Sequence, residues 1–490
     1  MMRKAIAALA AAVLLLVGGG LSVMADNTYQ YSYSYHNGEL VESLPAFELR
    51  QVIDNRALTV NVTMGGIVDV EVSDDTIYLV DESNSRIYLV DKETYTISSF
   101  LKTIQNEEGG IVVDQETGKQ LMLSGPQSVF WFEPENELYV ADTGEERILV
   151  LDADGHYLKR IITRPEGMIG DTVFAPSKLI VTPIGKIYFT VNGSTEGIVE
   201  LQNDGSFSCY FGTNEPEVSV IDYIWKMLSS DTIRDQMGRT YAPEFSNIDV
   251  DAEGFIYATS LDVESTEKLF RFNGKGANVI RSAGNAELTG DAVTGLVNTT
   301  TTSQFVDIAV SDYGLYAVLD KTYGRVFIYN FDGYLLNVFS SRGSAQGQLR
   351  TATGIAWDGD DLIVVDGALA LAYVYTPTPF GRVMLDAEEY YYHGDWAKAD
   401  EQYRTAVKLN ANYYVAYSGI GRNCLMNGEY EDAMYYFELS DDKDGYSQAY
   451  EEYRSQLIKD NYGWVFAFIF LILGAIVYSE VRYQRKKKKS

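Results

Sequence analysis

A chain of 490 residues with a formal net charge of −30 is too long for one ordinary hydrophobic core and too acidic to attract nucleic acid. Without the basic residues near its two ends, residues 26–479 carry a net charge of about −37, which repels phosphate backbones. The two cysteines, Cys209 and Cys424, fall in different predicted domains, so a structural disulfide is not expected.

The first 25 residues are predicted to be a secretory signal peptide. Arg3 and Lys4 precede an apolar run over residues 5–17, and the small side chain of Ala25 suits a cleavage site. The predicted mature chain therefore begins outside the cytoplasm, with residues 26–380 as its first domain.

That domain contains a repeated unit of roughly 40 residues, the length expected of one propeller blade. The copies share an alternating strand, a turn marked by Gly or Asp, a buried strand rich in Tyr, and a further hairpin. They cover residues 66–100, 125–162, 176–211, 245–280, 305–339 and 353–375. The repeats predict a mainly β protein in the form of a six-bladed ring.

In three copies an Asp closes one apolar run, and an Arg opens the next run five positions later. The pairs are Asp81 with Arg86, Asp142 with Arg147, and Asp320 with Arg325. Because a unique catalytic site does not recur from blade to blade, we interpret these pairs as structural, with solvated pairing at the surface as the alternative.

The ring needs one more strand, because Thr376-Pro377-Thr378-Pro379 cannot continue the last copy. Residues 26–37 contain the alternating run Tyr29–Tyr35, which belongs to no copy. We expect this strand to complete the sixth blade and close the ring.

The pattern Tyr-Val-Ala-Asp-x-x-x-x-Arg-Ile at Tyr139–Ile148 resembles the NHL repeat. The ring is similar to the six-bladed NHL propellers related to sugar-lactone hydrolases and antibiotic lyases. A lactonase-like member would need a divalent cation in the central channel, held by carboxylate and amide groups. Turns and Asp–Arg pairs account for most of the Asp and Asn residues, and we expect none of His36, His156 and His393 to face the channel. No catalytic residue, cofactor or metal ligand is assigned.

An insertion at residues 212–244 separates the third and fourth copies. Its segment Ser219–Arg239 has apolar residues at helical spacing, among them Ile221, Trp225 and Leu228. These side chains either pack on one end of the ring, where they could cover the channel, or form a face that binds a partner.

Residues 381–460 are predicted to be helical and align with themselves at an offset of 34 residues. Gly394, Trp396, Ala399 and Tyr403 match Gly428, Tyr430, Ala433 and Phe437. This segment resembles a tetratricopeptide repeat. Because such arrays usually need about three repeats, this short array should lean on another part of the chain, either as a spacer or as a docking site.

Residues 461–479 carry no charge and are predicted to form one transmembrane helix. The basic tail, residues 480–490, places the carboxyl end in the cytoplasm. The propeller and the helical repeats would then lie outside the cell membrane, anchored by a single pass.

These features predict a bacterial-type surface protein whose propeller is a binding or scaffold module with a protein partner in the membrane or envelope. Resemblance to propeller–tetratricopeptide proteins implies an accessory role in a membrane transport system. The alternative is a membrane-tethered, metal-dependent sugar-lactone hydrolase or a related lyase. Three channel ligands from different blades would favour the enzyme, whereas a channel lined by backbone and apolar groups would favour binding.

Overall fold

The computed structural model describes residues 31–487 except 37, 107, 114–117, 153–154, 156, 169–172, 195, 213–242, 262–266, 283–287 and 295–299. The predicted signal peptide lies outside the described residues. So does most of the predicted helical insertion, including Ile221, Trp225 and Leu228.

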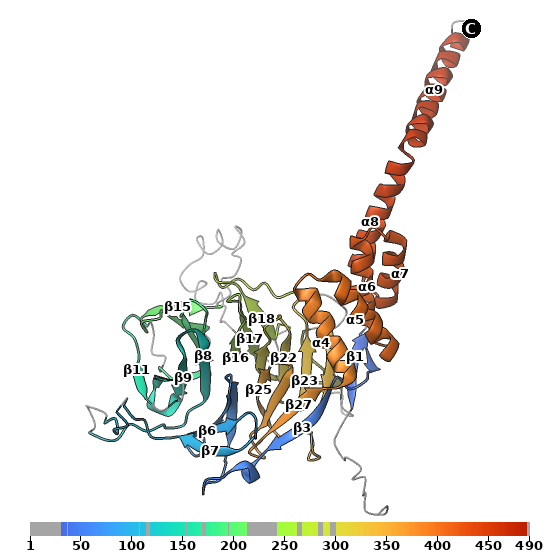
Figure 1. The fold of residues 1–490 in the computed structure, drawn as a ribbon. Coiled ribbons are helices and arrows are strands. Elements are labelled where there is room, and N and C mark those ends of the chain that lie inside the picture. The colour runs from blue at the N-terminus through green and yellow to red at the C-terminus, as the bar shows by residue number, and fades with distance from the viewer. Residues whose placement is uncertain are drawn as a thin grey trace, which may run out of the picture.

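Six antiparallel sheets form a ring of blades, which confirms the predicted fold class (Figure 1). The first three blades are β4 (Ile67–Val72), β5 (Thr76–Asp81), β6 (Arg86–Asp91) and β7 (Ile97–Leu101); β8 (Ser128–Phe132), β9 (Glu137–Asp142), β10 (Arg147–Asp152) and β11 (Leu158–Ile162); and β12 (Pro176–Val181), β13 (Ile187–Val191), β14 (Ile198–Leu201) and β15 (Phe207–Phe211). The other three contain β16 (Phe245–Val250), β17 (Ile256–Ser260) and β18 (Leu269–Phe272); β21 (Phe305–Val310), β22 (Tyr316–Asp320), β23 (Arg325–Tyr329) and β24 (Leu335–Phe339); and β25 (Ala352–Asp358), β26 (Asp361–Asp366) and β27 (Leu371–Pro377). A separate hairpin joins β19 (Ala292–Thr294) to β20 (Thr300–Thr302).

The core lies between neighbouring blades. The second strand of each blade is covered on both faces, which explains why β5 and β9 are apolar runs and not alternating ones. Tyr78 and Val80 of the first blade, for example, pack in one cluster with Leu138 and Val140 of the second. Each blade therefore depends on both neighbours to bury its faces.

The ring closes through a different strand from the one predicted. The outer strand of the sixth blade is β3 (Phe47–Ile53), which pairs antiparallel with β27. The predicted closing segment forms β1 (Ser32–His36), which adds a fifth strand to the fifth blade beside β24 and continues into β2 (Glu39–Glu42).

A buried carboxylate accounts for this correction. The hydroxyl groups of Tyr33 and Tyr35 both donate to Asp291, which also pairs with Arg325 of the fifth blade. The alternating tyrosines that suggested a closing strand are therefore fixed to the fifth blade. The run Phe47–Ile53 is left to pair with the open edge of β27.

We expect proline at both Arg50 and Gln51 to open the ring. Proline has no backbone N–H to donate to the ladder with β27, and its ring is poorly tolerated where two strands pair. Both side chains are exposed, so the effect comes from the backbone. The thermal unfolding midpoint should fall by many degrees. The matched control, proline at Leu40 and Val41 of β2, should have a much smaller effect, and equal losses would contradict closure by β3.

Helices follow the sixth blade. They are α4 (Pro379–Tyr392), α5 (Trp396–Leu409), α6 (Tyr414–Met426), α7 (Tyr430–Ser440), α8 (Lys443–Asp460) and α9 (Tyr462–Lys487). Gly394 and Gly428 follow α4 and α6 with φ of +76° and +77°, a backbone region that favours glycine. Figure 1 shows α4 against the ring, with α8 and α9 extending away from it.

The helical segment, residues 379–460, packs on the fifth and sixth blades in one continuous core that includes Leu336, Phe380 and Met384. Polar groups join the two parts as well. The buried carboxylate of Glu388 accepts hydrogen bonds from Asn330 of the ring (2.9 Å) and from the hydroxyl of Tyr403 (3.1 Å). Burial raises the pKa of Glu388 to about 7. The helical segment therefore packs against the propeller.

Replacing Glu388 by Gln should stabilise the protein at high pH. The folded state keeps the Glu388 proton up to about pH 7, whereas an unfolded chain loses it near the ordinary pKa of 4.5. The contribution of Glu388 to the free energy of unfolding is therefore greatest below pH 4.5 and is lost as the pH rises through about 7. Glutamine can accept from Asn330 and donate to Tyr403 without that loss.

The free energy of unfolding should rise by roughly 2–3 kcal/mol at pH 8 and stay unchanged near pH 4, as urea titrations can measure. Glu389→Gln, at the exposed neighbouring position, is the control. A destabilised Glu388→Gln protein at pH 8 would show that the carboxylate is charged and needed at this interface.

The helix α9 has the composition of a membrane span. Residues Tyr462–Tyr483 are mostly apolar, and at 1.5 Å per residue they extend for about 33 Å. Its large side chains are uncovered; Trp464, for example, is 80% exposed and Leu471 is 72% exposed. In the described part of the chain it is the one helix long and apolar enough to cross a membrane.

Candidate functional site: the central channel

The innermost strands of the blades surround a cavity of about 500 Å³ on the axis of the ring. Four of these strands contribute a polar side chain to its inner end, here called the inner layer. Its members are Asp69 (β4), Lys178 (β12), Asn247 (β16) and Asp307 (β21). The lining extends to the turns that contain Pro183, Asp251 and Asp312.

The polar side chains of the inner layer contact one another. The ammonium group of Lys178 pairs with Asp69 and also donates to the carbonyl of Val68 (3.3 Å). The amide of Asn247 donates to Asp307. Burial disfavours the charged form of Lys178, but Asp69 and Asp307 outweigh it and raise the pKa of this lysine. These contacts join polar side chains of different blades at the centre of the ring.

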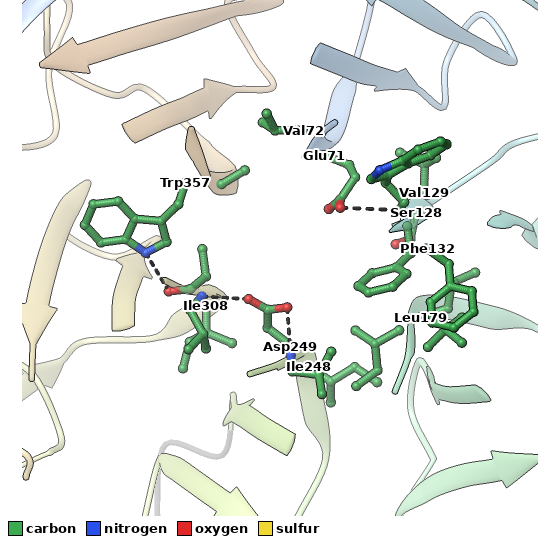
Figure 2. Close-up of a pocket in the computed structure, with 18 of the residues that line it drawn as sticks. Glu71, Val72, Ser128, Val129, Phe132, Leu179, Ile248, Asp249, Ile308 and Trp357 are labelled. Carbon is green, nitrogen blue, oxygen red and sulfur yellow. Dashed lines mark hydrogen bonds between the residues drawn. The ribbon is translucent and has the colours of Figure 1, made fainter. Parts of the chain in front are cut away.

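Two further carboxyl groups, Glu71 and Asp249, form an outer pair that points into the cavity from opposite blades, as Figure 2 shows. Burial raises the pKa of Glu71 well above its usual range, and the nearby Asp249 and Asp69 raise it further. Burial also raises the pKa of Asp249 to about 7, against the lowering effect of two backbone N–H groups. Apolar groups, including Ile308 and Trp357, line the cavity beside this pair.

The channel carboxylates also join successive blades. Each accepts a hydrogen bond from a backbone N–H group on the innermost strand of the next blade. The pairs are Asp69 with Val129 (3.1 Å), Glu71 with Trp131 (3.3 Å), Asp249 with Val310 (2.6 Å) and Asp307 with Ile355 (2.8 Å). These residues are positioned by the scaffold and in turn hold it together.

Sequence reasoning missed these channel residues because it attributed the acidic residues to turns and hairpin pairs. A usable signal was present. Asp69 and Glu71 alternate on one strand, as do Asn247 and Asp249, and side chains two positions apart in a strand face the same side. Alternating acids on an innermost strand therefore indicate the channel.

Carboxylate and amide groups from different blades do reach the channel, as the enzyme alternative required. Within the described ranges, however, no group of three or more His, Cys, Asp or Glu side chains is arranged to hold a metal ion. His36 stacks on Tyr414 of α6 (3.6 Å between ring centroids), and His393 follows α4, so both lie outside the channel. His156 lies outside the described residues.

The predicted Asp–Arg pairs face one another in the register of their hairpins, but they differ in contact. Arg147 forms an ion pair with Asp142 (2.7 Å). Arg86 instead lies over the ring of Phe100 (4.8 Å to the centroid), and Arg325 pairs with Asp291. Among the described residues, an ion pair across the turn therefore forms in one of the three hairpins.

The recurring aspartates fix loops. Each is fully buried and accepts hydrogen bonds from backbone N–H groups at the same end of its blade. Asp81 accepts from the N–H groups of Gly65 and Asn84, and Asp142 accepts from that of Ser124. Asp320 accepts from Gln304 and Thr322, and the equivalent Asp366 accepts from Arg350 and Ala368. This arrangement fits the structural interpretation.

Neither protein-family models nor curated proteins match this chain. Among solved structures, an uncharacterised protein from Bacteroides thetaiotaomicron is similar at 11% identity and TM-score 0.44, over 70% of this chain and 80% of that one. Virginiamycin B lyase from Staphylococcus aureus is similar at 12% identity and TM-score 0.39, over 67% of this chain and 99% of that one. An auxiliary nutrient binding protein from B. thetaiotaomicron is similar at 13% identity and TM-score 0.40, over 64% of this chain and 69% of that one. At these values the likenesses carry no argument about activity.

The asymmetry between hairpins gives a direct test. Arg147→Met should destabilise the ring by about 3 kcal/mol, because it leaves Asp142 buried without its charged partner. The matched change Arg86→Met should cost only about 0.5–1 kcal/mol, since it removes a cation–π contact and no ion pair. Chemical denaturation of the two variants measures the difference, and equal effects would contradict it.

Proposed function

We propose that this protein is a membrane-anchored binding module whose central channel takes a small organic cation. The observation that carries the proposal is the outer pair, Glu71 and Asp249. Their carboxyl groups face one cavity, and among the described residues their hydrogen bonds come from backbone N–H groups alone. A cation between them would offset both the burial and the mutual repulsion that raise their pKa values.

The cavity suits an amine better than a bare metal ion. Its volume of about 500 Å³ lies in the range of pockets for small molecules. Aliphatic and aromatic walls beside the outer pair match an alkyl chain that carries an ammonium group. A calcium or zinc ion needs several converging ligands, whereas the inner carboxylates are already engaged by Lys178, Asn247 and backbone groups.

The proposed topology follows from the two ends of the chain. Residues 1–25 would be removed as a signal peptide, α9 would cross the membrane, and the basic residues after it would stay in the cytoplasm. The ring and the helical segment would then lie on the outer side. Protection of the ring from protease added to intact cells would reverse this topology.

We further propose that the blades are NHL-like and that residues 381–460 are tetratricopeptide-like. The partner would be a protein of the membrane or envelope, and the role would be accessory to a transport system. The helical segment supports a docking role, because it is held rigidly on the ring beside the membrane helix. Residues Ile221, Trp225 and Leu228 stay a candidate lid or partner face.

Butylamine should raise the thermal midpoint of the full chain in lipid nanodiscs, whereas butanol should not. Binding should strengthen as the pH rises from about 6 to about 8, because the Asp249 carboxyl group ionises over this range while the amine stays protonated. Glu71→Gln should weaken binding by about tenfold. Glu39→Gln, exposed on β2, is the matched control.

Equal effects of butylamine and butanol would contradict the cation site.

The lactone hydrolase is the second candidate, favoured by the carboxylate and amide groups from several blades in the channel. We expect no hydrolysis of gluconolactone above buffer with calcium, zinc or manganese. Robust metal-dependent turnover that Asp249→Asn abolishes would replace the binding proposal with the enzyme.

A further inference from the structure

A second cavity, of about 540 Å³, lies between the fifth and sixth blades. Among the described residues, its lining contains three basic side chains, Lys321, Arg342 and Arg350, together with five threonines and Gln304, but no acidic one. These residues come from β20, from the β22–β23 turn and from loops that lead into the innermost strands β21 and β25. They therefore lie at the end of the ring opposite the channel mouth, which is formed by turns after the innermost strands.

The three basic side chains of this basic cavity are exposed, and none forms an ion pair within the described ranges of the chain. Two other basic residues of the ring differ from these three. Arg147 and Lys178 are paired with carboxylates and buried. In a protein with 69 acidic and 39 basic residues, three cations around one cavity without an acidic neighbour in its lining point to an anionic ligand.

The backbone beneath the basic cavity is fixed before any ligand arrives. Asp320 accepts from the N–H groups of Gln304 and Thr322, both at 2.9 Å. Asp366 holds the N–H groups of Arg350 and Thr351 in the same way. Both carboxylates are fully buried among these N–H groups, so they do not face the cavity. Binding would not have to order these loops, which lowers its cost.

We propose that the basic cavity binds a phosphorylated sugar. Guanidinium and ammonium groups recognise phosphate, and a phosphate monoester carries a charge near −2 at neutral pH, which suits three cations better than a carboxylate does. Threonine hydroxyl groups and the Gln304 amide can donate to and accept from sugar hydroxyls. The volume accommodates a ligand of this size. This site is independent of the channel.

The test is calorimetry on the full chain in nanodiscs with three probes: glucose 6-phosphate, glucose and inorganic phosphate. Glucose 6-phosphate should bind, and each of the other two should bind at least about tenfold more weakly. Arg350→Gln and Arg342→Gln should each weaken glucose 6-phosphate by about tenfold or more. Because both side chains are exposed, thermal midpoints should not change and loss of binding will not reflect unfolding.

Two controls separate this proposal from other effects. Lys275→Gln removes an exposed charge from another blade and should leave binding within about twofold. Glu71→Gln alters the channel and should leave it unchanged. The proposal is overturned if glucose 6-phosphate shows no binding at about 10 mM, if inorganic phosphate binds as tightly, or if Lys275→Gln weakens binding as much as Arg350→Gln does.

Discussion

The pairing of β3 with β27 is the constraint on which the rest of this structure depends. It completes the sixth blade and leaves no open edge between the first and last parts of the ring. It also builds the surface that receives the helices. The carbonyl of Ala46, just before β3, lies so close to Gly381 of α4 that a Cβ atom there would overlap it. Asn410 at the end of α5 donates to Ser43 (3.0 Å).

Buried carboxylates serve this protein in two distinct ways. At one end of the blades they accept several N–H groups from loops and fix the backbone. Along the channel they accept N–H groups from the next blade and keep part of their surface toward the cavity. The outer pair differs from the inner carboxylates because, among the described residues, its hydrogen bonds come from backbone N–H groups alone, whereas Lys178 and Asn247 engage Asp69 and Asp307. That difference separates a candidate site from a scaffold group of the same residue type.

The blades could be predicted from sequence because local patterns determine them. Apolar runs, Gly and Asp turns and the five-residue Asp–Arg spacing recur, and Gly394 and Gly428 mark helix ends by backbone conformation alone. The closing strand could not be predicted in this way. Both Tyr29–Tyr35 and Phe47–Ile53 can form strands, and the choice depends on Asp291, which lies far along the chain and is buried against Tyr33.

The side-chain partners were equally beyond local patterns. Arg86 and Arg147 occupy the same place in their hairpins, yet an aromatic ring attracts one and a carboxylate the other. The channel acids follow a simple two-residue alternation, but the same residue types are common in turns. Only the arrangement of six blades around one axis shows which carboxyl groups converge.

Closure by β3 also sets the order in which this protein can assemble. The strand containing Leu49 is synthesised early, and its partner strand with Tyr375 is among the last parts of the ring to be made. Until then β3 has no partner in the sixth blade, and the ring cannot lock. The ring as a whole can therefore form only after the strands of the sixth blade have been made. This one pairing, with its large separation in sequence, makes closure a late step in folding.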